Sequence, residues 1–380
     1  MKAKTIKGIS PEEIKKALTI SIADGFKPTL ALVFLSITQD RNAVCEILNN
    51  QEIAIFGATT NGEFINDEIK KNSTAIILFD IKPDYFTIIF EEFQHRNFSD
   101  ASERIAKKAL EKFQKPAFLI LGSDFKTDAE EIILGFENVC GKDVNIFGGM
   151  AGDDYAFKDQ FVFTNSKSSD HGLIALVFDE NKILIRGKAT HGWKAVGTPK
   201  TVTKSEGNHV FTVDGVSVLE LTKKYGGLDE LTEANNQEQL ALIATNFPLQ
   251  LQREKGDPVM RPGLVIDWQD GSFYCGGKVP QGSKVRFSLP PDFDVIDKVV
   301  NGLKDLKKAE MPEADAVIVF SCAGRIVSLG PLMEKEIEGI YKIWNAPMAG
   351  FFSNGEIARA TAGNNDLHNL TACCVVLKEK

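Results

Sequence analysis

The sequence predicts a mixed α/β (α+β) protein of two domains, in which sheets with both parallel and antiparallel strands are flanked by helices. Some apolar strand-like segments are separated by amphipathic helical segments, whereas others follow one another through short turns, so both kinds of strand pairing are expected. In addition, a unit of strand, glycine turn and acid recurs at residues 55–64, 145–154 and 347–357. These pseudo-repeated units are the feature that links the fold to a function.

The first domain begins with a helix over residues 10–24. Ser10 is its N-cap, Pro11 takes the first helical position and Glu13 completes a capping box. The following elements are expected in order: a strand at 30–37, a helix at 40–49, a strand at 52–58, an antiparallel hairpin made of 74–81 and 85–93 around Pro83-Asp84, a helix at 101–113, a strand at 116–122, a helix capped by Thr127 and Glu130 that stops at Gly141, a strand and turn at 144–152, and successive antiparallel strands at 160–165, 172–179 and 182–190.

A change in composition marks the expected domain boundary. Residues 191–209 are rich in Gly, Thr and Lys, and we place the boundary near residue 197, which gives domains 1–196 and 197–380. The second domain is expected to contain a hairpin around 202–213, helices near 214–225 and 234–245, a hairpin that turns at Asp270-Gly271, a strand at 284–289, a helix at 291–309, and an α/β half from 315 onward with a helix at 332–344.

Composition and charge exclude several classes of partner. The 380 residues have a formal charge of −8 and lack a dense basic stripe, which argues against nucleic acid and against an anionic membrane surface. No apolar run approaches the roughly 20 residues that cross a bilayer, and the N-terminus does not resemble a signal peptide, so we expect a cytoplasmic protein. The six cysteines form no CxxC pair, which indicates reduced, mostly buried thiols.

The repeated turns are the first candidates for a ligand site. A glycine after a strand permits close backbone approach to a ligand, and the acid that follows can accept hydrogen bonds from an ammonium or hydroxyl group. The alternative is a tight Asn-Gly hairpin with a solvated acid. If the strand ends face one cleft between the halves, they bring together Gly57, Thr59, Thr60, Asn61, Gly62, Glu63, Gly149, Gly152, Asp153, Ser353, Asn354, Gly355 and Glu356.

Other single residues offer further chemistry. Arg325 follows a strand and is suited to a bidentate grip on a carboxylate, or else to an ion pair with Glu356 or another acid. Cys322 is a candidate nucleophile with His368 as its base, or else a small core residue. His191 is a weak candidate for a haem ligand, with packing or hydrogen bonding as the alternative. No complete catalytic set is visible, and no catalytic residue is assigned.

These motifs together resemble the FIST proteins, which have an N-terminal and a C-terminal FIST domain. The resemblance rests on "GATTNGEF", "FGGMAGDD", the linking segment "HGWKAVGTPKTVTKSEGNHVFTVDG", "SCAGR", "PMAGFFSNGEI" and "HNLT", which run nearly from end to end of the chain. Ala195 is a departure, because the family more often has proline there.

The resemblance implies an intracellular sensory module of signal transduction that binds a small ligand, for which an amino acid has been suggested. Carboxylates at Glu63, Asp153 and Glu356 with the guanidinium of Arg325 would suit such a zwitterion. Some FIST-only proteins look like haem-dependent nitric oxide sensors that act on a histidine kinase, so a haem protein is the first alternative and an enzyme of unknown class the last. We assign no cofactor, and we expect the output to pass through a signalling partner such as a histidine kinase.

Overall fold

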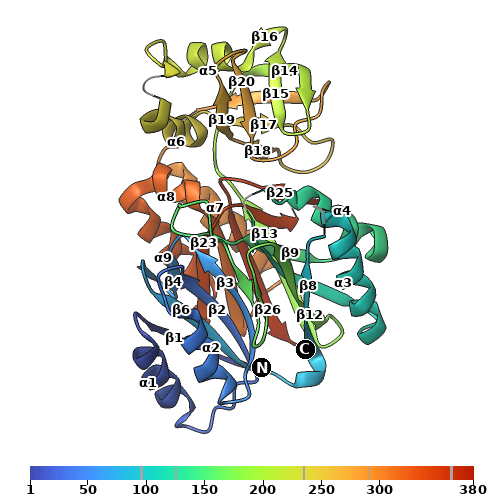
Figure 1. Ribbon diagram of the computed structural model, residues 1–380, viewed down its shortest axis with the longest axis vertical. Coiled ribbons are helices and arrows are strands. Elements are labelled where there is room, and N and C mark those ends of the chain that lie inside the picture. Colours follow the sequence, from blue (N-terminus) through green and yellow to red (C-terminus); the bar gives the residue numbers. More distant parts are fainter. Residues whose placement is uncertain (95–96, 125, 234–235, 290, 360–362) are drawn as a thin grey trace.

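The computed structural model describes residues 1–380 except 95–96, 125, 234–235, 290 and 360–362. It confirms the mixed α/β class, because helices flank sheets that contain parallel and antiparallel pairs. Three six-stranded sheets form the lower part of Figure 1, and an eight-stranded sheet formed within residues 195–288 lies above them. We call these regions the three-sheet body and the upper part. The expected domain division at residue 197 stays a prediction.

The three-sheet body consists of three units that repeat one order of elements: strand, helix, strand, helix, strand, hairpin, strand. The first unit contains β1 (Lys2–Gly8), α1 (Pro11–Ile22), β2 (Leu30–Ser36), α2 (Arg41–Asn49), β3 (Ala54–Thr60), β4 (Glu63–Ile65), β5 (Glu68–Lys70) and β6 (Thr74–Asp80). The second contains β7 (Phe86–Glu92), α3 (Phe98–Lys112), β8 (Pro116–Gly122), α4 (Ala129–Cys140), β9 (Ile146–Met150), β10 (Val162–Phe163), β11 (Ser168–Ser169) and β12 (Gly172–Asp179).

The third unit follows the same order with two additions. It contains β13 (Ile183–Thr190), α7 (Asp294–Ala309), β22 (Ala316–Cys322), α8 (Ala323–Leu329), α9 (Met333–Trp344), β23 (Met348–Ser353), β24 (Glu356–Arg359), β25 (Asn365–His368) and β26 (Ala372–Glu379). The upper part is inserted between β13 and α7, and the two helices α8 and α9 take the place of the second helix. The molecule is therefore a threefold repeat with one large insertion.

Each unit gives its hairpin to the sheet of another unit. Hairpin β4–β5 pairs with β23, hairpin β24–β25 pairs with β9, and hairpin β10–β11 pairs with β3, all antiparallel. The other strands of each unit stay together: the second and third are parallel, as in β2 and β3, and the last pairs antiparallel with the first two, as β6 does with β1 and β2. The three units are thereby locked into a closed ring.

The three sheets share one central core and cover their outer faces with helices. Phe34, Phe320 and Phe351 meet in the centre, with ring centroids 4.9 Å apart for Phe34 and Phe351 and 5.5 Å apart for Phe320 and Phe351. The outer faces pack under α1 and α2, under α3 and α4, and under α7 and α9. Burial on both faces explains why strands such as β2 are continuous apolar runs rather than alternating ones.

Local signals predicted most of the helices, but α8 was not predicted and the predicted cap of α4 was wrong. Ser10 caps α1 by accepting a hydrogen bond from the backbone N–H of Glu13, as expected. The predicted cap of α4 by Thr127 and Glu130 is wrong, because Asp128 accepts from the N–H groups of Glu130 and Glu131. The Thr127 hydroxyl instead donates to the Ser123 carbonyl.

Two predicted strand pairings are also wrong. Strands β6 and β7 do not form a hairpin, because a 3₁₀ turn, η1 (Pro83–Tyr85), carries the chain from the first sheet to another. Strands β10, β12 and β13 are not neighbours either, since each belongs to a different sheet. In both cases the strands themselves were predicted correctly, and only their predicted pairing was wrong.

The upper part consists of the following elements: β14 (Ala195–Glu206), β15 (His209–Val213), β16 (Val216–Ser217), α5 (Val218–Gly226), α6 (Asn236–Asn246), β17 (Leu249–Leu251), β18 (Val259–Arg261), β19 (Gly263–Asp267), β20 (Ser272–Cys275) and β21 (Lys284–Ser288). The predicted helix near 234–245 is present as α6, and residues 234–235 lie outside the described residues. Predicted hairpins at β14–β15 and β19–β20 are confirmed. Residues of the upper part build their own apolar core.

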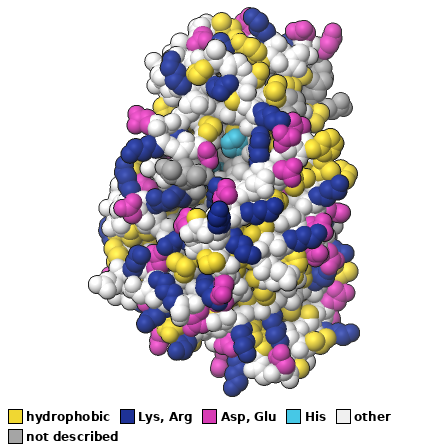
Figure 2. Space-filling model, turned by 180° about the vertical axis from the view of Figure 1, so that it is seen from behind, with side chains coloured by type: hydrophobic (Ala, Val, Ile, Leu, Met, Phe, Trp, Pro, Cys, Tyr) yellow, Lys and Arg dark blue, Asp and Glu magenta, His cyan; other side chains and the backbone are white. Residues whose placement is uncertain are grey.

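Side chains of both charges are interspersed over the back of the molecule (Figure 2). Among the described residues, no helix has the length and apolar character needed to cross a bilayer.

Candidate functional site

The three repeated turns meet in the three-sheet body, at the ends of β3, β9 and β23. They are equivalent by position: Thr60-Asn61-Gly62-Glu63, Ala151-Gly152-Asp153-Asp154 and Ser353-Asn354-Gly355-Glu356. We call them the three corners. Each is the point where the chain leaves one sheet to form or approach a hairpin of another. The alternative of a tight hairpin at Asn-Gly is therefore wrong, because β3 and β4 lie in different sheets.

Backbone hydrogen bonds join the corners in a cycle. The N–H of Asn61, in the first corner, donates to the carbonyl of Phe352 in β23 at 3.1 Å. The N–H of Asn354 donates to the carbonyl of Met150 at 3.1 Å, and the N–H of Gly152 donates to the carbonyl of Thr59 at 2.9 Å. Each corner thus donates a hydrogen bond to the strand that leads into another corner, and the three hydrogen bonds form a closed cycle.

Two asparagine side chains hold the corners together. Asn61 Nδ2 donates to Asn354 Oδ1 at 2.8 Å, and Asn354 Nδ2 donates to the carbonyl of Ala151 at 2.9 Å. Asn61 Oδ1 accepts from the N–H of Asp153 and of Tyr155. Gly152 is required here because a Cβ at this position would lie only 2.5 Å from the Asn61 side chain. The sequence prediction that the turns converge is in agreement with these contacts.

The two glutamates of the corners are buried in matching environments. Glu63 accepts from the hydroxyls of Thr60 and Ser73, the latter at 2.7 Å. Glu356 accepts from Ser353 at 2.6 Å and from Thr371 at 2.9 Å. Burial raises the pKa of Glu63 to about 7 and that of Glu356 to about 8, and the hydroxyl hydrogen bonds offset only part of this rise. Both side chains are fully enclosed, so the protein itself supplies their partners.

The remaining acid, Asp153, organises its own loop. Its carboxylate accepts from the backbone N–H groups of Phe157 at 2.9 Å, Lys158 at 2.5 Å and Asp159 at 3.0 Å. Burial alone would raise its pKa, but these hydrogen bonds hold the pKa below its usual value. Thr59 has a similar local role, since its hydroxyl accepts from the N–H of Phe161. Gly57 and Gly149 lie against the rings of Phe163 and Phe320 in the core.

Arg325 does not offer its guanidinium to the corners. It is fully buried and forms a bidentate ion pair with Glu336 of α9, in which its Nε lies 2.9 Å from Glu336 Oε1. Its Nη1 donates to the carbonyls of His191 and Leu370, both at 2.8 Å. The ion-pair alternative for Arg325 is therefore the one observed, with Glu336 in place of Glu356.

His191, His368 and Cys322 show no reactive geometry. His191 Nδ1 accepts from the N–H of Trp193 at 2.9 Å, which places the proton of the neutral ring on Nε2. A haem ligand at Nε2 needs the other tautomer, so this arrangement does not fit haem. His368 Nε2 lies 3.1 Å from the Ala358 carbonyl rather than beside a thiol. Burial raises the pKa of Cys322 above its usual range, which is typical of an inert core thiol.

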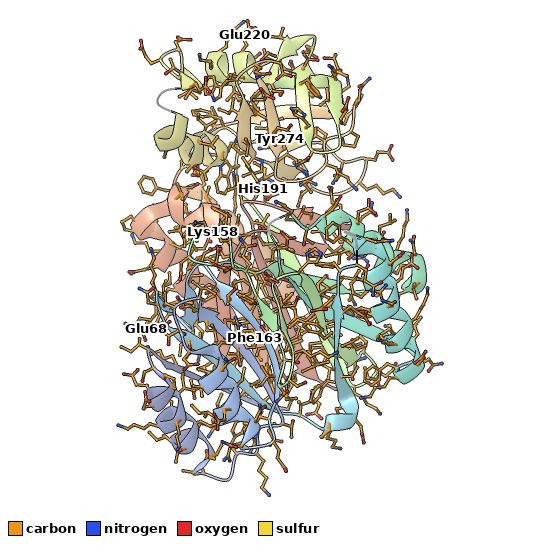
Figure 3. The ribbon with its side chains drawn as sticks, viewed as in Figure 1. Glu68, Lys158, Phe163, His191, Glu220 and Tyr274 are labelled. Carbon is orange, nitrogen blue, oxygen red and sulfur yellow. The ribbon has the colours of Figure 1, made fainter. Side chains whose placement is uncertain are left out.

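A cleft of about 600 Å³ lies where the upper part meets the three-sheet body. On the side of the body it reaches the corner Ser353-Asn354-Gly355-Glu356 through Asn354, the end of β9 through Met150, and the N-terminal end of α4. On the side of the upper part it is lined by the β19–β20 hairpin, including Val265 and Tyr274. Figure 3 shows Tyr274 in the upper part and His191 at the junction below it. Of the residues predicted to bind ligand, Asn354 lines this cleft and the enclosed glutamates do not.

Most charges of the cleft are neutralised within the protein. Arg261 is fully buried and pairs with Glu130 at 2.8 Å, while Lys278 pairs with Asp128 at 3.0 Å and also with Glu131. Lys126 is exposed and has no ion-pair partner among the residues that the structure describes. Among the described residues that line the cleft, Lys126 is the cation without an ion-pair partner.

Sequence reasoning missed the cleft residues of the upper part, and a signal for them existed. Gly276-Gly277 follows strand β20, as glycines follow the other strand ends, and Tyr274 is an aromatic residue just before them. This unit lacks the following acid, and the search for glycine with an acid therefore passed over it.

Comparison with protein families gives two matches along the chain. The FIST N domain matches residues 29–216, and the FIST C domain matches residues 221–359. No curated protein sequence matches the chain.

Proposed function

The chain belongs to the FIST family, whose domains are sensory domains of signal transduction, and from this premise we propose that it senses a small ligand in the cleft between the upper part and the three-sheet body. The observation that carries the proposal is the position of the cleft. It touches both parts of the molecule, and it reaches one corner at Asn354 and the end of β9 at Met150. A ligand bound there contacts both sides of the junction at once.

The groups that line the cleft suit an amino acid. The free ammonium of Lys126 can pair with an α-carboxylate. The carboxylate of Asp124 lies in the same loop, where it accepts from the N–H of Lys126 and lies 3.0 Å from His171 Nδ1, and it can also accept from an α-ammonium. Asn208 of the upper part and Asn369 of the body add amide groups. The ligand class is thus argued from the cleft and not from the enclosed Glu63, Glu356 and Arg325.

The junction provides a way for binding to change the structure. The upper part joins the body only through residues 191–194 and 289–293 of the chain, and ion pairs such as Arg261–Glu130 and Arg253–Asp366 cross between them. A ligand that prefers one angle between the two parts shifts the population toward that angle. The new surface would then be recognised by a signalling partner such as a histidine kinase, and the proposal includes no catalytic step.

Thermal unfolding with a panel of the twenty common amino acids tests this proposal. A ligand at one hundred times its Kd stabilises the folded state by about 2.7 kcal/mol, and we expect the Tm to rise by roughly 3 °C. The variant Lys126→Gln should lose most of this rise. Lys16→Gln is the matched control, because Lys16 is an exposed lysine on α1, far from the cleft in sequence and in the fold.

Two results would contradict the proposal. One is a Tm that stays constant with every member of the panel. The other is a rise that Lys126→Gln and Lys16→Gln leave equally intact, since the ligand would then bind outside the cleft.

A further inference from the structure

We infer that the ligand is an amino acid with an aromatic side chain, whose ring stacks on Tyr274. This inference rests on the proposed function and adds the chemical class of the side chain. Tyr274 lines the cleft and is 40% exposed, although tyrosine is a large and partly apolar residue. Among the described residues that line the cleft, Tyr274 is the one with an aromatic side chain.

The ring of Tyr274 is fixed from behind. It stacks on His209 with a centroid distance of 3.9 Å and an interplanar angle of 16°. His209 in turn lies 4.1 Å from the ring of Phe211, and its Nε2 is 2.6 Å from the hydroxyl of Ser272. His209 and Phe211 do not line the cleft, so the stack supports Tyr274 from the far side. A ligand ring that stacks on Tyr274 therefore meets a preorganised surface, and binding does not have to order the Tyr274 side chain.

Apolar residues line the same cleft as Tyr274. Val265 is the cross-strand partner of Tyr274, is 49% exposed and also lines the cleft. Leu264 adds a further apolar side chain from β19, and Met150 adds a thioether from the body. Thioethers and branched aliphatic side chains pack well against aromatic rings. Tyr274, Val265 and Leu264 together give apolar surface to the wall of the cleft that the upper part forms.

The polar end lies on the other wall. Lys126 and Asp124 belong to the loop that precedes α4 in the body, whereas Tyr274 and Val265 belong to the upper part. An aromatic amino acid has its ring at one end and its charges at the other. The ring would contact the upper part, and the charged groups would contact the body. A small amino acid such as alanine has no ring for Tyr274 to contact, so we expect it to bind more weakly than an aromatic one.

Isothermal titration calorimetry on the full chain tests this inference with four probes: L-phenylalanine, L-tryptophan, L-alanine and L-serine. We expect phenylalanine and tryptophan to bind the wild-type protein at least tenfold more tightly than alanine and serine. Tyr274→Ala should weaken phenylalanine binding by about tenfold, since an aromatic pair contributes up to about that factor beyond its buried area. Tyr274→Phe keeps the ring and should retain binding.

Tyr225→Ala is the matched control. Tyr225 is 42% exposed, nearly as exposed as Tyr274, and belongs to α5 outside the cleft. This variant should bind phenylalanine as the wild type does. The comparison of phenylalanine with alanine on the wild-type protein needs no variant, so it decides the question even if Tyr274→Ala fails to fold.

The outcomes separate the two proposals. If alanine and serine bind as tightly as phenylalanine, the aromatic inference is wrong while the proposed sensory function stands. If aromatic ligands bind equally to the wild type and to folded Tyr274→Ala, the ring does not stack on Tyr274 and the inference is wrong. If none of the four probes binds and the wider panel is also silent, both proposals are overturned.

Discussion

At the scale of single residues, Glu63 and Glu356 make the protein sensitive to pH. Their pKa values are raised from 4.5 to about 7 and about 8, because each carboxyl is buried between two hydroxyl groups. Between pH 4.5 and these values the folded state keeps protons that the unfolded state has released. The contribution of both groups to stability is therefore fully present below pH 4.5 and is lost as the pH rises through 7 to 8.

The first prediction is that Glu63→Gln and Glu356→Gln each flatten the pH dependence of stability. Each wild-type group lowers the free energy of unfolding by up to about 1.4 kcal/mol per pH unit over its range. Urea unfolding at pH 5.5 and pH 8 should show a smaller loss in each variant than in the wild type. Glu46→Gln, at an exposed position of α2, should keep the wild-type slope, and unchanged slopes in both corner variants would contradict the assigned burial.

Residue types alone predicted that the corners belong together, but they did not predict the partners of nearby residues such as Arg325. The recurrence of glycine, asparagine and acid indicated that Glu63, Gly152 and Glu356 belong together, and the cycle of hydrogen bonds agrees with this. The pairing of Arg325 with Glu336 could not be predicted, since an arginine after a strand looks the same whether it binds a ligand or a buried acid. Tyr274 was missed for another reason, because the two glycines after its strand are followed by Lys278 and not by an acid.

At the scale of elements, the sequence specified strands but not the sheets to which they belong. An apolar alternation determines which face of a strand is buried, while the partner is set by tertiary contacts. Strands β6 and β7 flank a Pro-Asp turn, as the strands of a hairpin do, yet they lie in different sheets. The same effect occurs in the three exchanged hairpins, β4–β5, β10–β11 and β24–β25. A hairpin that joins the sheet of another unit has the same local sequence signals as one that joins the sheet of its own unit.

The second prediction concerns the junction of these exchanged elements. In Gly152→Ala, the new Cβ would lie 2.5 Å from the Asn61 side chain and would push it away from Asn354. We expect a loss of about 1–3 kcal/mol in the free energy of unfolding, as for other overpacked cores. Gly355→Ala, at the neighbouring corner, is the control: its Cβ would have nothing closer than 3.3 Å and should cost clearly less. Equal losses in urea unfolding would show that Asn61 is not a fixed part of the ring.

At the scale of the whole molecule, the chain consists of three units and one insertion. In the first unit two residues separate the first strand from the first helix, between Gly8 and Pro11, and in the second unit five residues do so, between Glu92 and Phe98. In the third unit the entire upper part lies at this point, between β13 and α7. The three-sheet body thus contains all the strands of its three sheets without the upper part.

The third prediction is that residues 195–288 can be replaced by a short Asn-Gly turn without loss of the body fold. The two ends are already adjacent, because Ala195 and Ser288 are partners in β14 and β21 and the N–H of Leu289 donates to the Lys194 carbonyl at 2.9 Å. A two-residue turn therefore fits between them. The shortened chain should unfold in one cooperative transition with the circular dichroism of a mixed α/β protein, at a lower Tm because Glu130 and Leu367 lose Arg261.

Ligand binding, unlike the body fold, should be lost when the upper part is removed. The shortened chain keeps Lys126 and Asp124 but lacks Tyr274 and Val265, so the amino acids that stabilise the full chain should no longer raise its Tm. The control is Lys126→Gln in the full chain, which removes a ligand contact and leaves the upper part in place. If the shortened chain is unfolded, the upper part is integral to the body and the description as an insertion is wrong. If it is folded and still binds, the ligand site lies within the body, and sensing does not require the two parts to move against each other.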